Sequence, residues 1–292
     1  MNPALENLEI AILLEAVFRH SGYDFRNYAP ASIKRRIQEC VRVEKVETIS
    51  DLQARVLHDP NCLERFLLAL SINVTAMFRD PAFYLAFRTR VVPLLRTYPS
   101  LRIWVAGCAT GEEACSLAIL LQEEGLYERC KIYATDLNAA MLKKAAAGVF
   151  PLDGMKDYTT NYVHAGGTRS FSEYYTAKYG SAVIHAGLRK NILFTQHNLV
   201  TDGSFNEFHV ILCRNVLIYF NQELEARVSR LLNQSLVMFG ILGLGAKESL
   251  KFLPDEPCFK ELDPRNKIYR KTDQNCGQCP MAPKRCELGK PM

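Results

Sequence analysis

Two glycines and an aspartate stand where strand-like segments end, and these residue types suit the binding of a nucleoside. Gly107 and Gly111 follow the apolar run Leu101–Val105, in the turn sequence AGCATG. Their missing side chains allow a ligand to approach the backbone closely. Asp136 ends a second apolar run, 25 residues beyond Gly111, where an acidic residue commonly binds ribose hydroxyls. The strand–turn–helix context therefore predicts a nucleoside site, with a purely structural use of the glycines as the alternative.

The residues after the second glycine narrow the choice of ligand. Glu112 and Glu113 open the segment that follows Gly111, and two carboxylates there would repel a pyrophosphate. The segment also lacks the lysine–serine pair of a phosphate-binding loop. A ligand with a cationic end, such as the amino group of S-adenosylmethionine, fits an acidic turn better. The alternative is that the glutamates only complement the helix dipole, and this alternative has more weight for Glu112 than for Glu113.

Alternating strand and helix patterns position these residues. Short apolar runs predict strands, and longer periodic segments between them predict helices. The expected strands are Leu101–Val105, Lys131–Thr135, Phe208–Cys213 and Gly240–Gly245, with Ile268–Arg270 as a last edge strand, and the expected helices are Glu112–Glu124, Ala139–Ala147 and Gln222–Val237. This alternation predicts a parallel sheet covered on both faces. The ligand of such a sheet binds beyond the carboxyl ends of the strands, where Gly107 and Asp136 fall.

The first 90 residues or so show helical periodicity and no strand pattern. The first helix would place Leu5, Leu8, Ile12, Leu13 and Ala16 on one apolar face. After Pro30, the residues Ile33, Ile37 and Val41 form a second apolar stripe. Two further helices are expected over Ile49–Leu57 and Leu63–Ile72. We therefore expect residues 1–90 to form a helical N-terminal domain with its linker.

An inserted segment and the end of the chain depart from these patterns. Residues 150–190 are rich in tyrosine and glycine, and Tyr174–Lys178 and Ala182–Leu188 are expected as strands around a turn at Gly180–Ser181. We expect residues 91–272 to form a second domain with a small β-subdomain at about 150–190, and residues 273–292 to form a polar tail. The tail holds Cys276, Cys279 and Cys286, one ligand short of a zinc site, so no metal is predicted.

Composition restricts the class of protein. The chain has 292 residues, 48% of them hydrophobic and 23% charged, with a net charge of +5. These values are typical of a globular protein with a sizeable core. The apolar stretch Ile10–Val17 contains Glu15; it is too short to span a membrane and lacks the flanks of a secretory signal. We therefore interpret the ten cysteines as reduced thiols of a cytoplasmic protein that is not inserted in a membrane.

Four separate stretches form a set of motifs. They are SINVTAMFRD over Ser71–Asp80, ATGEEACS over Ala109–Ser116, IYATD over Ile132–Asp136 and CRNVLIYF over Cys213–Phe220. Together they resemble the signature stretches of the chemotaxis receptor glutamate methyltransferases, the CheR type, in order and at matching intervals. The resemblance implies a class I S-adenosylmethionine-dependent methyltransferase with a Rossmann-like, mostly parallel sheet. It also implies a small all-helical N-terminal domain and an inserted β-subdomain.

The resemblance further implies an activity and a set of site residues. Its family transfers the methyl group of S-adenosylmethionine to receptor glutamates, which gives methyl esters and S-adenosylhomocysteine. Carried over by position, Glu113 would meet the methionine end of the cofactor, Asp136 would meet the ribose, and Tyr219 would lie close to the transferred methyl group. The other contacts carried over would be Asn73, Thr75 and Arg79 from the first motif, and Asn198, Leu199, Arg214 and Asn215 beside the adenosine. Gly107 and Gly111, inferred above from the strand–turn–helix pattern, complete the expected cofactor contacts.

A glutamate acceptor fits the residue types of the chain. Its carboxylate is already ionised at neutral pH, so it attacks a sulfonium methyl group without a general base. The enzyme then mainly has to hold oxygen, carbon and sulfur in line. The resemblance implies Arg79 and Tyr219 as the catalytic residues, with Arg79 orienting the carboxylate and Tyr219 positioning the methyl donor. Without the resemblance, a surface arginine and a core tyrosine are the simpler interpretations.

The segment from Arg26 to Arg42 is basic, with five basic residues, one acidic residue and a local charge of +4. A solvated helix face is the simpler interpretation. The resemblance implies instead that this helix docks on the acidic methylation helices in the cytoplasmic part of a receptor, with Arg35, Arg36 and Arg42 as candidate contacts. Such charges mainly steer encounter. Nucleic acid fits less well because the segment lacks interleaved aromatic residues for base stacking.

Three other functions stay open from the sequence. The first is an enzyme of the same fold that methylates another protein or a small acid. The second is a cofactor-binding signalling adaptor without transfer activity, and the third is a metal- or redox-sensing module that works through the tail. For the favoured function, the short hairpin of the insertion argues against docking through a receptor's C-terminal peptide. We expect direct recognition of the receptor helices, by a monomer.

Overall fold

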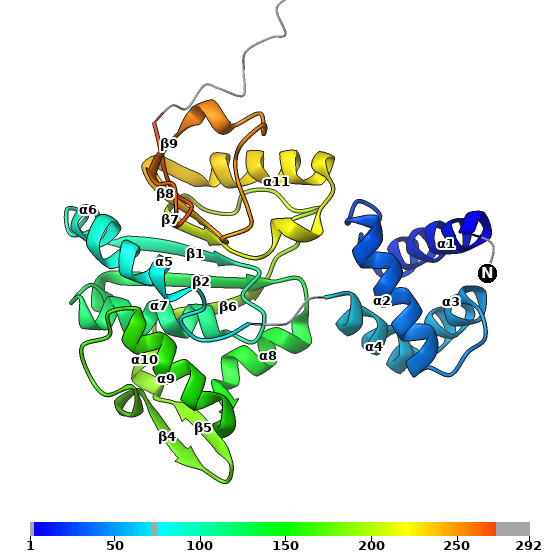
Figure 1. Ribbon diagram of the computed structural model, residues 1–292, viewed down its shortest axis with the longest axis horizontal. Coiled ribbons are helices and arrows are strands. Elements are labelled where there is room, and N and C mark those ends of the chain that lie inside the picture. Colours follow the sequence, from blue (N-terminus) through cyan, green and yellow to red (C-terminus); the bar gives the residue numbers. More distant parts are fainter. Residues whose placement is uncertain (1–2, 72–74, 273–292) are drawn as a thin grey trace, which may run out of the picture.

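The computed structural model describes residues 3–71 and 75–272, and a helical unit lies beside an α/β unit in it (Figure 1). The helical unit contains α1 (Pro3–Ser21), α2 (Pro30–Val43), α3 (Ile49–His58) and α4 (Pro60–Leu70). Proline suits the first turn of a helix, since its fixed φ matches and its missing N–H is not needed there. The Thr48 side chain caps α3 at the N–H of Asp51, and Asp59 caps α4 at the N–H of Asn61. These local signals define where three of the helices begin.

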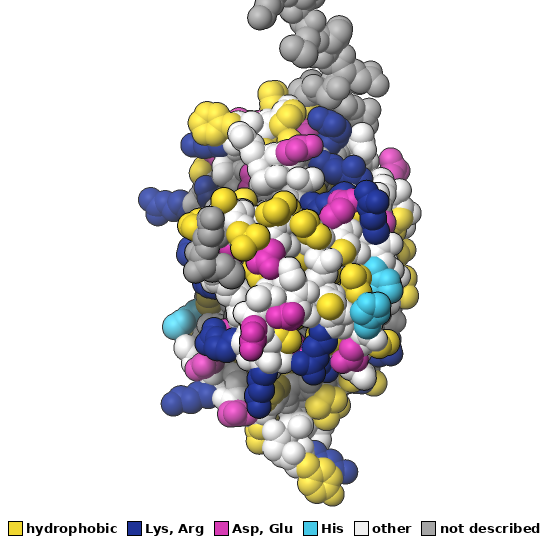
Figure 2. All heavy atoms as spheres, turned by 90° about the vertical axis from the view of Figure 1, so that its right-hand side faces the viewer, with side chains coloured by type: hydrophobic (Ala, Val, Ile, Leu, Met, Phe, Trp, Pro, Cys, Tyr) yellow, Lys and Arg dark blue, Asp and Glu magenta, His cyan; other side chains and the backbone are white. Residues whose placement is uncertain are grey.

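The buried face of α1 differs from the predicted one. Leu13, Leu14 and Val17 are buried in the core of the helical unit. Three residues of the predicted face are instead exposed, namely Leu5 (51%), Leu8 (56%) and Ile12 (48%). The prediction was wrong because apolar residues occur around much of this helix, and packing against α3 selects which side is buried. Figure 2 faces this end of the molecule and shows exposed apolar side chains among charged ones.

A short helical segment connects the helical unit to the sheet. It consists of α5 (Pro81–Ala86), a π-helical turn (Phe87–Val91) and α6 (Val92–Leu95). Phe83, Tyr84 and Phe87 of this segment are buried in the same core as the sheet. The segment therefore belongs to the packing of the α/β unit.

A seven-stranded, mostly parallel sheet forms the centre of the α/β unit. Its order is β6-β2-β1-β7-β8-β10-β9, with β10 antiparallel to both of its neighbours. The strands are β1 (Leu101–Ala106), β2 (Cys130–Asp136), β6 (Ile192–Gln196), β7 (Phe208–Cys213), β8 (Leu236–Leu244), β9 (Phe259–Asp263) and β10 (Ile268–Lys271). The long helices around it are α7 (Glu112–Glu123), α8 (Ala139–Ala147) and α11 (Gln222–Ser235).

The sheet corrects the predicted strands in three places. Strand β6, at one edge, was not predicted, and β8 begins at Leu236 rather than at Gly240. The predicted strand at Ile268–Arg270 is present, but β9 lies outside it, so it is not the edge. Strands β6 and β9 are each five residues long with partly exposed side chains, and a short edge strand carries a weak periodic signal.

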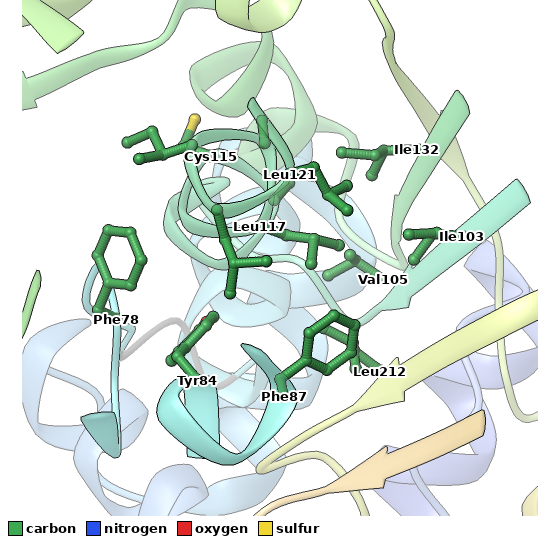
Figure 3. Close-up of a cluster of buried hydrophobic side chains, with 14 of the residues drawn as sticks. Phe78, Tyr84, Phe87, Ile103, Val105, Cys115, Leu117, Leu121, Ile132 and Leu212 are labelled. Carbon is green, nitrogen blue, oxygen red and sulfur yellow. The ribbon is translucent and has the colours of Figure 1, made fainter. Parts of the chain in front are cut away.

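Successive residues of β1 face opposite sides of the sheet and belong to different cores. Ile103 and Val105 belong to the core that contains α7, whereas Trp104 and Ala106 belong to the core that contains α11. Figure 3 shows Leu117 and Leu121 of α7 gathered with Phe87 and with Ile103 and Ile132 of the sheet. Helix α7 is buried from Glu112 to Leu121, as expected for a helix between other layers. This packing fixes the position of the turn between β1 and α7.

The inserted segment contains a separate three-stranded antiparallel sheet of order β3-β5-β4. Its strands are β3 (Val149–Pro151), β4 (Tyr175–Lys178) and β5 (Ser181–Ile184), and its helices are α9 (Met155–His164) and α10 (Ala186–Arg189). The predicted strand Ala182–Leu188 is therefore too long, because its second half forms α10. Strand β3 was not predicted from the sequence.

A buried carboxylate attaches this subdomain to α7. Glu123 accepts hydrogen bonds from the hydroxyl groups of Tyr162 and Tyr174 and from the N–H of Thr168, and it forms an ion pair with Arg88. Arg88 also donates to the carbonyl of Ala165 at 3.0 Å. A buried charge is tolerated when it is paired and hydrogen-bonded in this way.

The described residues contain neither a candidate membrane helix nor a candidate metal cluster. Within residues 3–71 and 75–272, no helix combines the length and apolar character that a membrane crossing requires. The same ranges contain no cluster of three or more histidine, cysteine or acidic side chains suited to a metal. Seven cysteines in these ranges are buried and unpaired: Cys40, Cys62, Cys108, Cys115, Cys130, Cys213 and Cys258. Cys276, Cys279 and Cys286 lie outside the described residues.

The observed face of α1 predicts the effect of two neighbouring substitutions. Leu13→Ala removes a side chain that is 0% exposed, and we expect it to lower the free energy of unfolding by about 3 kcal/mol. Ile12→Ala, the matched control on the exposed side, should change that free energy by less than about 0.5 kcal/mol. Urea denaturation followed by far-ultraviolet circular dichroism measures both. Equal losses for the two variants would mean that the buried face is assigned wrongly.

Candidate functional site

Loops at the carboxyl ends of β1, β2 and β7 surround two adjoining hollows. The larger encloses about 690 Å³, part of it open to solvent, and the smaller about 400 Å³. Asp136 at the end of β2 and the segments that follow β1, β6 and β7 line the larger hollow, with Gly107, Asn198, Leu199, Asn215 and Tyr219. The smaller hollow is lined by residues that include Thr75, Arg79, Glu113 and Arg214. Gly107 and Asn215 line both hollows, so the two form one elongated site.

Gly107 allows the loops after β1 and β7 to touch. Its φ is +72°, and a Cβ atom added there would lie 2.6 Å from Cγ2 of Val216. A side chain at this position would therefore need both a strained backbone and a displaced Val216. The glycine forms the floor shared by the two hollows.

Gly111 and Glu112 do not line either hollow. Gly111 has a φ of +93°, and an added Cβ would lie 2.9 Å from the Cβ of Ala145 in α8. The glycine therefore permits the close approach of α7 and α8, which is a packing role. The buried carboxylate of Glu112 accepts a hydrogen bond from the Thr110 hydroxyl at 2.7 Å, and burial raises its pKa.

The carboxylate of Asp136 is held at the end of β2 by two backbone N–H groups. Ala109 donates to Oδ2 and Asn138 donates to Oδ1, each at 2.9 Å. Burial raises the pKa of Asp136, and these hydrogen bonds act against that rise. Each carboxylate oxygen has a second lone pair, so the group is still able to accept hydrogen bonds from a diol in the larger hollow.

Asn198 and Leu199 lie beside Asp136 on the loop that follows β6. The N–H of Asn198 donates to Asp202 at 2.8 Å, and its side-chain oxygen accepts from the N–H of Val200 at 2.9 Å. These bonds fix a compact turn against the larger hollow. Leu199 is 8% exposed and gives this wall an apolar surface suited to the face of an aromatic base.

A buried ion pair dominates the smaller hollow. Arg214 donates to Oε1 of Glu113 at 2.7 Å, to Oδ2 of Asp80 at 2.9 Å and to the carbonyl of Arg79 at 3.0 Å. Its guanidinium also stacks on Phe83, 4.1 Å from the ring centroid. Arg214 was predicted beside the adenosine, but the structure places it with Glu113 in the smaller hollow and not in the larger one. Arg214, Arg79 and the carboxylate of Glu113 line this hollow, and Asp80 also pairs with Arg214, so charges of both signs meet here.

The remaining predicted residues of the first motif lie along the smaller hollow. Thr75 and Arg79 line it together with Ala76, and the N–H of Arg79 donates to the carbonyl of Ala76. Asn73 lies outside the described residues. The motif therefore reaches the site through the segment that joins the helical unit to α5.

Tyr219 lines the larger hollow at the end of the loop after β7. Burial raises its pKa, the positive charges of Arg36, Arg79 and Arg35 act in the opposite direction, and the negative charge of Glu248 acts together with burial. Three arginines from α2 and from the first motif thus share the surroundings of this tyrosine with one carboxylate. An anionic group that approaches Tyr219 would meet more positive than negative charge.

The three arginines predicted for docking have different environments. Arg36 is half-buried and donates to the carbonyl of Ala69 at 2.8 Å, so it also supports the end of α4 beside the site. Arg42 is exposed and pairs with Glu39 on its own helix. Arg35 is exposed and is the best of the three candidates for docking, because Arg36 supports α4 and Arg42 pairs with Glu39.

The helical unit supplies part of the larger hollow, which sequence reasoning missed. Tyr28, Leu70 and Ser71 line it. The segment around Tyr28 pairs with the loop after β7: the N–H of Ala29 donates to the carbonyl of Tyr219 at 2.7 Å, and the N–H of Asn221 donates to the carbonyl of Asn27 at 2.9 Å. No local sequence signal marks Tyr28, because its role depends on how two distant segments pack.

Sequence reasoning also missed a buried carboxylate behind the site. Glu248 is 4% exposed and accepts hydrogen bonds from the backbone of the loop that carries Asn215 and Tyr219. Burial raises its pKa, while the backbone hydrogen bonds lower it. It lines neither hollow. The sequence offered only a glutamate in a glycine-containing turn, a weak signal.

The donors and acceptors of the paired hollows fit S-adenosylmethionine. The larger hollow offers an apolar wall and the carboxylate of Asp136, which suit a base and a ribose. The smaller hollow offers the carboxylate of Glu113, which suits a cationic amino group. Gly107 leaves room between them.

Comparisons with known proteins agree with this arrangement. Residues 73–264 match the family model described as CheR methyltransferase, SAM binding domain, and residues 8–71 match the model described as CheR methyltransferase, all-alpha domain. The protein Cher3 of Pseudomonas putida is 50% identical over 266 residues, which cover 91% of this chain and 97% of that protein. A chemotaxis protein methyltransferase of Listeria monocytogenes is 31% identical over 252 residues, which cover 86% and 93%.

Solved structures show a more distant likeness. The structure of PKMT2 from Rickettsia typhi in complex with AdoHcy is 16% identical and covers 59% of this chain and 26% of that one, with a TM-score of 0.35. This value is too low to support an argument.

The anchored carboxylate of Asp136 yields a binding prediction. Asp136→Ala removes both the ribose acceptor and the two backbone contacts of the carboxylate, and we expect no S-adenosylhomocysteine binding detectable by calorimetry. Asp153→Ala, which changes an exposed aspartate outside both hollows, should bind as the wild type does. Unchanged binding by the Asp136 variant would remove the larger hollow as the nucleoside site.

Proposed function

The chain belongs to the CheR methyltransferase family, and on that basis we propose that it is a protein-glutamate O-methyltransferase of chemotaxis or related sensory receptors. It is an S-adenosylmethionine-dependent methyltransferase of that type. The finer proposal names glutamate side chains as acceptors, methyl esters as products and the cytoplasmic helices of receptors as partners.

The observation that carries the proposal is the pair of hollows with a carboxylate in each and a positive field at Tyr219. Asp136 would bind the ribose hydroxyls, and Asn198 and Leu199 would border the adenine. Glu113 would attract the amino group of the methionine end. Glu113 lines the smaller hollow beside Arg214 and Arg79, so its own carboxylate, and not the net charge of the hollow, would hold the amino group.

The chemistry needs no proton transfer. The cofactor supplies a methyl carbon bound to a positively charged sulfur, which makes that carbon electrophilic. An acceptor carboxylate oxygen would form the new bond to this carbon, and the electrons of the broken carbon–sulfur bond would stay on sulfur. The acceptor is already ionised at neutral pH, so alignment in a site shielded from water is the main requirement.

Residues near the junction of the hollows would provide this alignment. We assign Arg79 to orienting the incoming carboxylate, and Tyr219 to the wall beside the reacting methyl group. Arg36 adds positive charge at Tyr219. These groups attract an anion without taking up a proton, which suits a carboxylate better than a neutral amine.

We assign receptor docking to the helical N-terminal part of the chain, up to about residue 90, in the cytoplasm. Helix α2 carries Arg35 on its exposed surface, and its neighbour Arg36 lies beside the site. An acidic receptor helix guided by Arg35 would thus arrive close to Tyr219. Long-range attraction of this kind acts mainly on the rate of encounter.

A label-transfer experiment tests the acceptor chemistry. We expect the protein to transfer label from methyl-labelled S-adenosylmethionine to cytoplasmic fragments of chemotaxis receptors. The label should be released as methanol by mild base, as an ester requires. Base-stable label would indicate methylation of nitrogen instead. Absence of transfer by protein that binds S-adenosylhomocysteine would favour an adaptor without activity.

Arg35→Ala tests the docking surface separately from the cofactor site. Because exposed charges steer encounter, we expect the KM for receptor fragments to rise about threefold to tenfold at low ionic strength. S-adenosylhomocysteine affinity should not change. Arg230→Ala, at an exposed arginine of α11, is the matched control and should leave both quantities unchanged. Equal effects of the two variants would contradict docking through α2.

A further inference from the structure

We propose that Glu248 is a positioning residue for the cofactor site. Its carboxylate holds the backbone of Asn215, Val216 and Leu217, and through them the wall shared by both hollows. The inference rests on the proposed cofactor contacts and adds a residue that lies outside them. Glu248 would act through the loop after β7 without touching cofactor or acceptor.

Glu248 accepts hydrogen bonds from five backbone N–H groups, those of Gly245, Asn215, Val216, Leu217 and Ile218. Oε2 accepts from Gly245 at 2.5 Å and from Asn215 at 2.9 Å. Oε1 accepts from Val216 and from Leu217, each at 2.7 Å. Consecutive N–H groups that converge on one point form a concave anion site, and here the anion is a side chain of the protein itself.

Glu248 holds a loop of irregular backbone. Asn215 has a φ of +60°, a left-handed value that asparagine adopts more readily than most residues other than glycine. The N–H groups of Asn215 and Val216 precede the helical turn that begins at Leu217, and all three N–H groups lie beyond the end of β7. A buried N–H without an acceptor is costly. The carboxylate supplies acceptors to all three groups at once.

Gly245 shows independently that the chain makes room for this arrangement. A Cβ atom added at Gly245 would lie 2.7 Å from Oε2 of Glu248 and 2.8 Å from the N atom of Asn215. Its φ is not in the left-handed region, so backbone conformation does not require a glycine there. The missing side chain is explained by the close approach of the carboxylate and the loop.

A shift of this loop would change both hollows together. Asn215 lines both hollows. Val216 lines the larger one and packs on Gly107 without space for a Cβ atom. Tyr219 is carried at the end of the same loop. Through this loop, Glu248 therefore fixes the position of residues that line both hollows and of Tyr219, which we propose to lie beside the methyl group.

Glu248→Gln tests the proposal. Its amide oxygen is able to replace one carboxylate oxygen, but its NH₂ group would face N–H donors instead of accepting from them. We expect the dissociation constant of S-adenosylhomocysteine, measured by calorimetry on the full chain, to rise about tenfold or more. Glu256→Gln is the matched control, because Glu256 also accepts from a backbone N–H, that of Phe252, but is exposed and lines neither hollow. It should bind as the wild type does.

The melting temperature without ligand separates positioning from simple stabilisation. If Glu248→Gln melts at a lower temperature but binds S-adenosylhomocysteine within twofold of wild type, the positioning role is overturned while the cofactor site stands. If the wild type itself does not bind S-adenosylhomocysteine, the assignment of the hollows as the cofactor site is wrong, and the positioning role of Glu248 is wrong with it.

A measurement on the wild type covers the case in which Glu248→Gln does not fold. We expect the amides of Asn215, Val216 and Leu217 to exchange slowly with deuterium in the protein without ligand, because a buried carboxylate binds them. The amide of Gly203, an exposed residue, serves as the reference. Equally fast exchange in both segments would overturn the proposal.

Discussion

The contact between Gly107 and Val216 is the constraint on which the site depends. It joins the loop after β1 to the loop after β7, and the absence of a Cβ atom at Gly107 sets how closely they approach. Packing on both sides makes this contact rigid, since β1 is buried on both faces. The two hollows meet there, so their relative position follows from one backbone contact.

Side chains of both charges meet near this contact. In the smaller hollow, Arg214 pairs with Glu113 and Asp80, and Arg79 adds a second positive charge. Glu113 would attract the amino group of a sulfonium donor, whereas Arg79 and Arg36, which also act on Tyr219, would attract an anionic acceptor. The groups that a cationic donor and a carboxylate acceptor need therefore lie next to each other.

The sequence predicted the parts of the site that are encoded locally. Strands β1 and β2, the glycine turn and Asp136 follow from apolar runs and residue types, and the structure places them together. The membership of Arg214 in the smaller hollow could not be predicted, because it depends on an ion pair across 101 residues of chain. Tyr28 and Glu248 were missed for the same reason. The predicted buried face of α1 was wrong because apolar residues lie on more than one face of this helix.

The pairing of Asn27 and Ala29 with the segment Tyr219–Asn221 has a consequence for dissecting the molecule. An excised C-terminal fragment would lose the wall of the larger hollow that Tyr28, Leu70 and Ser71 supply, together with the backbone hydrogen bonds that hold Tyr219. The helical unit is thus a structural part of the site. Removing it would leave the larger hollow open on one side, so the α/β unit alone would not keep the complete site.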